Sequence, residues 1–153
     1  MKKRKFAIAI YLLLLLPCMA SAQTNTPKAT LNHIAHYVVN LSSSADFYMH
    51  VIGLDSIPEP FHDGKHVWLS IGYKSHLHLI QGATSIGVTN KNSHLCFTVA
   101  SVADFIKVLD KNKIEYENWA GDKKTVTARV DGVKQIYFKD PDGYWVEIND
   151  AKE

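Results

Sequence analysis

Residues 134–149 read KQIYFKDPDGYWVEIN, and this stretch decides the fold. Lys134–Phe138 and Tyr144–Asn149 each alternate apolar and polar side chains, as strands with one buried face do. Asp140-Pro141-Asp142-Gly143 lies between them and has the composition of a tight turn. The stretch therefore predicts two strands joined by a short turn. One face of the second strand carries Trp145, Glu147 and Asn149.

The preceding residues predict the remainder of a structural unit. His94–Val99 alternates as a strand does, and Ser101 with Asp104 has the spacing of a capping box at a helix start. Apolar residues recur at helical spacing from residue 102 to residue 113. Two strand-like stretches, Ile114–Trp119 and Thr125–Val130, follow the helix. The predicted order is a strand, a helix and then strands only.

The first half of the chain repeats this order. Residues 32–39 predict a strand, and Ser43 with Asp46 has the spacing of another capping box, before a helix that Gly53 ends. Strand-like stretches follow around residues 56–60, 66–71 and 75–81. Ala45-Asp46-Phe47 reappears in the second half as Ala103-Asp104-Phe105. Two similar halves predict one pseudo-twofold domain.

Four candidate metal ligands occupy equivalent places in the two halves. His33 and His94 lie in the first strand of their halves, and His78 and Glu147 lie in the last. Since side chains alternate across a strand, the more apolar face packs under a helix and the other face looks into a cup. All four side chains fall on the cup face. Imidazole and carboxylate groups together suit zinc, nickel, iron or manganese, so the pattern predicts a metal site.

Other side chains are candidates for lining a substrate site. Tyr37, Trp68 and Trp145 could form an apolar wall or serve ordinary packing. Arg129 could bind a substrate carboxylate or phosphate through two hydrogen bonds, or lie solvated on its strand. Cys96 could be a small buried hydrophobe or a reactive thiol. The substrate-lining candidates are Tyr37, Trp68, Cys96, Thr98, Arg129 and Trp145.

The N-terminus predicts export. Residues 1–22 contain four basic residues, an apolar run from Phe6 to Leu16 and the small-residue site Ala20-Ser21-Ala22. These are the parts of a secretory signal peptide cleaved after Ala22. The apolar run is shorter than the roughly 20 residues of a membrane-spanning helix. We therefore expect a periplasmic or secreted protein, with a flexible lead-in at 23–30 and one domain at 31–150.

Removal of residues 1–22 changes the charge and the cysteine content. The 17 Lys+Arg fall by four to 13, against 15 Asp+Glu, so the formal charge becomes −2. This composition excludes a basic nucleic-acid-binding protein. Cys96 is then the only cysteine, so no intrachain disulfide can form. We also expect no membrane association after cleavage.

The motifs resemble those of a known superfamily. Asn32-His33-Ile34-Ala35, Ser44-Ala45-Asp46-Phe47-Tyr48, Asn92-Ser93-His94 and the run from Tyr137 to Glu147 are similar to motifs of the vicinal oxygen chelate superfamily. This group includes glyoxalase I, bleomycin-binding proteins, fosfomycin resistance transferases and extradiol dioxygenases. The resemblance covers about residues 31–150, and the Asp-Pro-Asp-Gly turn followed by Glu147 is its most specific part.

The resemblance implies a fold and a ligand set. The fold is α+β, with two paired βαβββ modules that form a metal-binding cup, commonly in a homodimer whose sites involve both chains. His33, His94 and Glu147 match the family's metal positions, and His78 matches the fourth position. Glyoxalase I usually has a glutamate at that fourth position, so His78 is a departure that keeps a ligand and removes one candidate base.

The resemblance also implies a chemistry. We expect a glyoxalase-I-like lyase or isomerase with one divalent metal ion (Zn, Ni, Co, Fe or Mn). A small substrate would chelate this ion through two of its oxygens. Glu147 is the predicted catalytic residue, and either its carboxylate or a metal-bound hydroxide would move a proton between substrate carbons. The alternatives are an extradiol-type dioxygenase, a fosfomycin-resistance-like transferase, and a non-catalytic, bleomycin-resistance-like protein that binds a small molecule.

Overall fold

The computed structural model describes residues 27–152. The predicted signal peptide at 1–22 and the first residues of the predicted lead-in lie outside the described residues. From Leu31 onward the chain belongs to one compact unit. Within residues 27–152, no helix is both long and apolar enough to cross a membrane.

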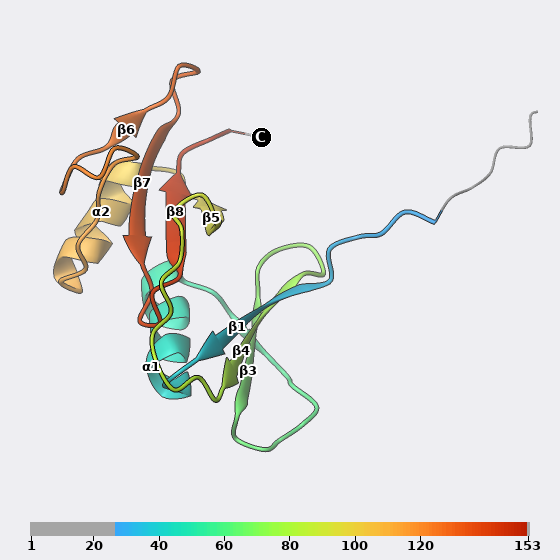
Figure 1. Cartoon of the computed structure of the whole chain (residues 1–153). Coiled ribbons are helices and arrows are strands. Elements are labelled where there is room, and N and C mark those ends of the chain that lie inside the picture. The colour runs from blue at the N-terminus through green and yellow to red at the C-terminus, as the bar shows by residue number, and fades with distance from the viewer. Residues whose placement is uncertain (1–26, 153) are drawn as a thin grey trace, which may run out of the picture. The chain divides into compact units, whose positions relative to one another are not determined.

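The first module contains one mixed sheet (Figure 1). Its strands lie in the order β1-β4-β3-β2, with β1 parallel to β4 and β3 antiparallel to both of its neighbours. A helical segment connects β1 to β2. The elements are β1 (His33–Val38), α1 (Leu41–Asp46), the π-helix η1 (Phe47–Ile52), β2 (Ser56–Ile57), β3 (His66–Ser70) and β4 (His76–Gln81).

The second module has the same topology. Its strands lie in the order β5-β8-β7-β6, again with the first and last strands of the module paired in parallel. The prediction of an α+β fold with two paired modules is therefore confirmed. The elements are β5 (His94–Thr98), α2 (Val102–Lys111), β6 (Thr127–Ala128), β7 (Lys134–Lys139) and β8 (Trp145–Asn149).

One predicted strand is wrong. Ile114–Trp119 is not a strand, and its backbone pairs with β7 only at Glu117, which exchanges two backbone hydrogen bonds of 2.9 Å with Tyr137. The turn at Asn118–Asp122 takes the chain away from the sheet after this point, and β6 then pairs with β7 further along. The edge of β7 is thus shared by two short segments instead of being covered by one strand.

The two helices begin differently. Ser101 caps α2 as predicted, since its hydroxyl accepts from the amide of Asp104 at 3.1 Å. The predicted Ser43 cap of α1 is wrong, because Asn40 accepts the amide of Ser43 instead, at 3.0 Å. Gly53 ends the first helical segment as predicted, in the left-handed conformation with a φ of 88°.

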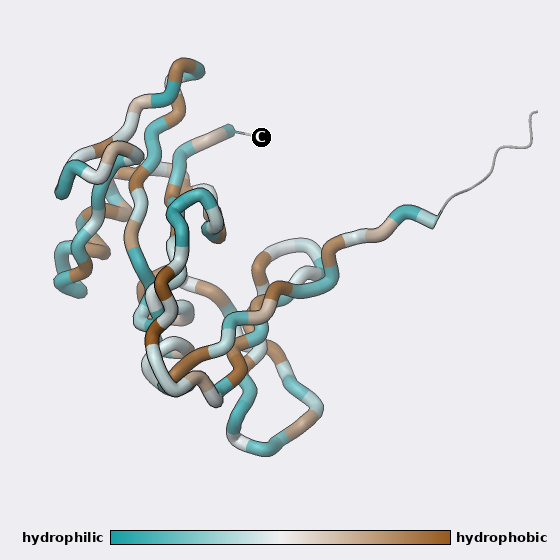
Figure 2. The backbone as a smooth tube through the Cα atoms, viewed as in Figure 1, coloured by the Kyte–Doolittle hydropathy of each residue, from teal (hydrophilic) through white to brown (hydrophobic). Residues whose placement is uncertain are grey.

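The core is continuous between the two modules. Phe47 of the first module and Phe105 of the second both lie next to Phe138 of β7, with ring centroids 6.2 and 6.1 Å apart. Burial of such large apolar side chains is the main favourable contribution to folding. Hydrophobic and hydrophilic residues alternate along β7 and β8 (Figure 2), as expected for strands with one face against this core.

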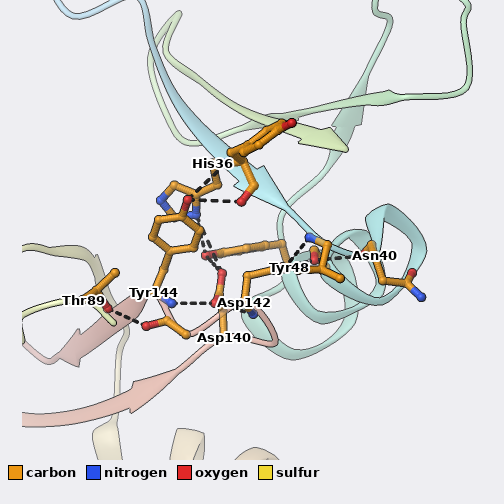
Figure 3. Close-up of polar contacts among 11 residues, drawn as sticks. His36, Asn40, Tyr48, Thr89, Asp140, Asp142 and Tyr144 are labelled. Carbon is orange, nitrogen blue, oxygen red and sulfur yellow. Dashed lines mark hydrogen bonds and ion pairs between the residues drawn. The ribbon is translucent and has the colours of Figure 1, made fainter. Parts of the chain in front are cut away.

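The Asp-Pro-Asp-Gly turn binds the first module through a buried polar network (Figure 3). Asp142 accepts from the amide of Val39 at 2.6 Å and from the hydroxyl of Ser44 at 2.5 Å. Asp140 accepts from the hydroxyl of Tyr48 at 2.8 Å, and burial together with Asp140 raises the pKa of that phenol well above its ordinary value. The motif that identifies the second module is therefore also its attachment to the first.

Candidate functional site

In the second module, His94 and Glu147 form the clearest pair of candidate ligands. They lie on adjacent parallel strands, and His94 Nε2 is 3.2 Å from Glu147 Oε2. The other ring nitrogen of His94, Nδ1, lies 2.6 Å from the carbonyl oxygen of Lys91, which can only accept, so Nδ1 is protonated and donates to that carbonyl. Metal-binding histidines commonly have this arrangement, in which a backbone carbonyl holds one nitrogen and leaves the other free to bind.

The surroundings of Glu147 hold it as a carboxylate. Burial raises its pKa, but hydrogen bonds from Asn149, Tyr137 and Cys96, together with nearby His94, outweigh burial and leave the pKa below its ordinary value. Asn149 donates to Glu147 Oε1 at 2.9 Å, and the Cys96 thiol donates to the same oxygen at 3.3 Å. An ionised, oriented carboxylate is suited to bind a divalent cation.

Cys96 is held as a thiol. Its side chain is exposed on the cup face, but partial loss of hydration at the sulfur and the adjacent Glu147 raise the pKa of Cys96 to about 12. Since the thiolate is the reactive form, this pKa argues against a nucleophilic role at neutral pH. Thr98, two residues further along β5, donates to Asn149 at 3.1 Å and so supports the residue that orients Glu147.

In the first module, His33 and His78 form a different kind of pair. The two imidazoles are stacked with centroids 4.2 Å apart, and Trp68 stacks on the opposite face of His78 at 4.0 Å. His33 Nδ1 is 2.8 Å from the side-chain oxygen of Asn32, which leaves its Nε2 available. Nε2 of His78 is buried and has no hydrogen-bond partner within the described chain.

The surroundings of His78 favour the neutral ring. Burial lowers its pKa, and the neighbouring imidazoles of His33, His76 and His66 lower it further. A neutral imidazole with a free nitrogen is the form that binds metal ions. The orphaned Nε2 of His78 therefore fits a metal ligand better than a satisfied structural histidine.

The structure does not bring the four predicted ligands together in one chain. Among residues 27–152, no three His, Cys, Asp or Glu side chains are grouped closely enough to hold a metal ion. Each module contributes one pair, and each pair lies on the face away from its helix. That face is open at β1, where His33, Ala35 and Tyr37 are exposed.

The remaining candidates are placed as follows. Tyr37 is 55% exposed, and the hydroxyl of Tyr144 bonds to both its backbone amide and its carbonyl at 3.2 Å. Trp145 donates its indole N–H to the carbonyl of Thr89 at 3.1 Å. Arg129 forms an ion pair with Asp131 near the β6–β7 turn, which occupies its guanidinium.

Comparison with known proteins assigns the family. The family model of the glyoxalase/bleomycin resistance protein/dioxygenase superfamily matches residues 30–148. The chain belongs to this superfamily. A comparison with curated proteins gives no significant match.

Solved structures of the superfamily share the fold. A lactoylglutathione lyase from Agrobacterium tumefaciens is 20% identical with a TM-score of 0.59, covering 82% of this chain and 96% of its own. A glyoxalase/dioxygenase from Nostoc punctiforme is 23% identical with a TM-score of 0.67, covering 84% and 99%. The fosfomycin resistance protein FosX from Listeria monocytogenes is 18% identical with a TM-score of 0.66, covering 82% and 96%. At these identities the likeness concerns the fold.

Sequence patterns single out Cys96 and Thr98 but assign no site role to Tyr137. The hydrogen bond of Tyr137 to Glu147 holds that carboxylate, and burial together with Glu147 raises the pKa of the phenol. The available signal was register, because Tyr137 is the direct cross-strand partner of Glu147. Cross-strand partners lie on the same face, so a pairing diagram would have brought the two side chains together.

Proposed function

We propose that this protein is a metal-dependent lyase or isomerase of glyoxalase type, acting on a small substrate that chelates the metal through two oxygens. Membership of the superfamily supports this proposal, and the arrangement of His94 and Glu147 carries it. An imidazole whose Nδ1 is held by the Lys91 carbonyl faces an ionised carboxylate at 3.2 Å. His33 and His78 add two further imidazoles with available Nε2 atoms.

We further propose that two copies of the chain complete the site. One copy would contribute His33 and His78, and its partner would contribute His94 and Glu147. Two observations support this arrangement: each pair is too small to hold a metal ion alone, and the face of β1 is open. Three imidazoles and one carboxylate fit a divalent Zn, Ni, Co, Fe or Mn ion and leave positions free for substrate oxygens.

The roles of the chain's residues follow from their surroundings. A bound metal would supply Lewis-acid stabilisation of negative charge on the substrate oxygens. Glu147, ionised because its pKa is lowered, would accept a proton from one substrate carbon and return it to the next. Asn149 would keep the carboxylate oriented during both transfers. Cys96 stays protonated and would act only as a hydrogen-bond donor.

The test combines metal content with activity. Elemental analysis of the purified protein should find one divalent ion per chain, and a methylglyoxal–thiol assay should detect turnover. The double variant His33→Ala, Glu147→Gln should lose both. His50→Ala is the matched control, because His50 is exposed and lies in the helical segment η1 instead of on the strands that carry the candidate ligands. Unchanged metal content in the double variant would contradict the proposed centre.

We also propose that the mature protein is exported and begins at Gln23. The basic N-terminal residues, the apolar run and Ala20-Ser21-Ala22 support this proposal. N-terminal sequencing of the protein recovered from the extracytoplasmic fraction would test it, and recovery of an intact Met1 terminus in the cytoplasm would contradict it.

A further inference from the structure

The indole N–H of Trp68 is a buried donor without an acceptor. Trp68 Nε1 is one of two buried side-chain polar atoms in residues 27–152 that lack a hydrogen-bond partner, and His78 Nε2 is the other. Burying an N–H without an acceptor costs free energy, so such groups in folded proteins usually meet a partner that the chain itself does not provide.

The two unpartnered atoms belong to neighbouring residues. Trp68 and His78 are direct cross-strand partners on β3 and β4, so their side chains leave the sheet on the same face. Their rings are stacked with centroids 4.0 Å apart and an interplanar angle of 2°. The ring that carries the unused donor of Trp68 is therefore stacked on the ring that carries the unused ligand atom of His78, on the cup face.

A second tryptophan shows that the orphaned donor is particular to this position. Trp145 also lies on a cup-face strand, but the carbonyl of Thr89 accepts its indole N–H at 3.1 Å. The described part of the chain thus provides an acceptor for the indole N–H of Trp145 but none for that of Trp68, which is available to a bound molecule.

The metal ion proposed at His78 would favour a negatively charged acceptor for Trp68. On this face of the first sheet, the imidazoles of His33, His76 and His78 stack on one another or on Trp68. The imidazole of His66 lies against Phe61, and its Nδ1 is 2.9 Å from the carboxylate of Asp63. An anionic oxygen held by a metal beside His78 would be within the same aromatic cluster as the Trp68 N–H.

We propose that Trp68 donates its indole N–H to an anionic oxygen of the substrate, next to the metal that His78 helps to hold. This inference rests on the proposed metal centre. It narrows the substrate to a small compound that carries a carboxylate or that forms an enolate when it loses a proton. Trp68 is then a specificity-determining residue and not only part of an apolar wall. A donor aimed at developing negative charge is also a recognised source of rate acceleration.

The experiment observes the indole N–H directly. The mature chain has three tryptophans, so the zinc-loaded, ¹⁵N-labelled protein should give three indole N–H signals. Oxalate is the probe, because it is a dianion that chelates metals through two oxygens. Titration with oxalate should move the Trp68 signal downfield, as expected for a new hydrogen bond, and should leave the Trp145 signal in place. Trp68→Phe and Trp145→Phe assign the two signals.

Affinity provides a second test. Trp68→Phe keeps an aromatic ring on His78 but removes the donor, so it should retain zinc and bind oxalate about tenfold more weakly. Trp119→Phe is the control, because Trp119 is 47% exposed and is not a substrate-lining candidate, and it should bind oxalate as the wild type does. Zinc uptake with an unmoved Trp68 signal, or without oxalate binding, would overturn this inference alone. A wild-type protein that takes up no zinc would overturn both the metal centre and the inference.

Discussion

The two modules share a topology but hold their candidate ligands in opposite ways. In the second module, hydrogen bonds from Asn149 and Cys96 hold Glu147, and a backbone carbonyl holds His94. In the first, stacking between Trp68 and His33 holds His78, whose Nε2 stays unpaired. The charged Glu147 is thus fixed by hydrogen bonds, and the neutral His78 is fixed by stacked aromatic rings.

This difference follows from the chemistry of the two groups. A buried carboxylate is costly unless donors surround it, and the donors also keep it ionised. A neutral imidazole costs less to bury than a carboxylate and can be oriented by parallel rings, although its unpaired nitrogen still lacks a partner within the described residues. We call each ligand pair a half-site. The polar groups of the His94/Glu147 half-site have hydrogen-bond or ion-pair partners without a metal, whereas the His33/His78 half-site keeps an unpartnered nitrogen until a ligand binds.

The largest expected effect concerns whether the two half-sites come from one chain or from two. A heterodimer is prepared from one His33→Ala chain and one Glu147→Gln chain, each with its own affinity tag. If sites form between chains, one site pairs the two mutated modules and the other pairs the two intact modules. The heterodimer should then hold about half the wild-type metal content, measured by elemental analysis.

The controls are the two variants as homodimers, in which every site lacks one ligand and metal content should fall nearly to zero. A site formed within one chain gives a different result, because each chain of the heterodimer then carries one defect. A heterodimer as metal-free as the homodimers would therefore show that the half-sites of a single chain combine.

Local pattern was enough to predict the modules and the faces of their strands. The alternation of His33, Ala35 and Tyr37 with Ile34, His36 and Val38 places the first three on the open face, and the structure leaves those three exposed. It also buries His36 against Tyr48 and Tyr144 on the helix side. Side chains alternate between the two faces of any strand, so the face of each residue can be predicted from the sequence without knowing what the strand pairs with.

Features that depend on distant partners could not be predicted. The sequence does not indicate that the Ser44 hydroxyl donates to Asp142, because the two residues are 98 positions apart. Ile114–Trp119 has the pattern of a strand, but the sheet edge accepts only Glu117. The stacking of Trp68 on His78 likewise requires the register of β3 on β4. The distance between the two ligand pairs is set by how the modules pack.

The next effect concerns the attachment of one module to the other. Asp142→Ala removes the acceptor of the Val39 amide and one of two acceptors of the Ser44 hydroxyl, which also lies 3.0 Å from the carbonyl oxygen of Asn40. We expect the free energy of unfolding to fall by about 1–3 kcal/mol, measured by urea denaturation. Asp46→Ala is the control, since its carboxylate is exposed and its ion-pair partner, His50, is exposed too, so stability should stay near that of the wild type.

Loss of stability in Asp142→Ala should also reveal how the modules cooperate. Because Phe138 packs against both Phe47 and Phe105, we expect the weakened protein still to unfold in one transition. Two separate transitions, one for each module, would show that the network and not the shared core couples them. Wild-type stability in Asp142→Ala would contradict the attachment itself.

The smallest expected effect is a dependence on pH that separates the two half-sites. Burial and neighbouring imidazoles lower the pKa of His78 in the folded protein, so its contribution is present above the unfolded value of about 6.5 and is lost as the pH falls through the folded pKa. The pKa of Glu147 is also lowered, so its contribution is present above the unfolded value of about 4.3 and disappears only in stronger acid.

These two windows allow each half-site to be tested alone in metal-free protein. Urea unfolding between pH 7 and pH 5 should show stability falling with pH in the wild type and falling less in His78→Phe, which keeps a ring between Trp68 and His33. Glu147→Gln should follow the wild type over this range and should diverge from it below about pH 4.5. If His78→Phe retained the full slope between pH 7 and pH 5, the unpaired imidazole would not be the group that responds, and the contrast between a satisfied and an unsatisfied half-site would fail.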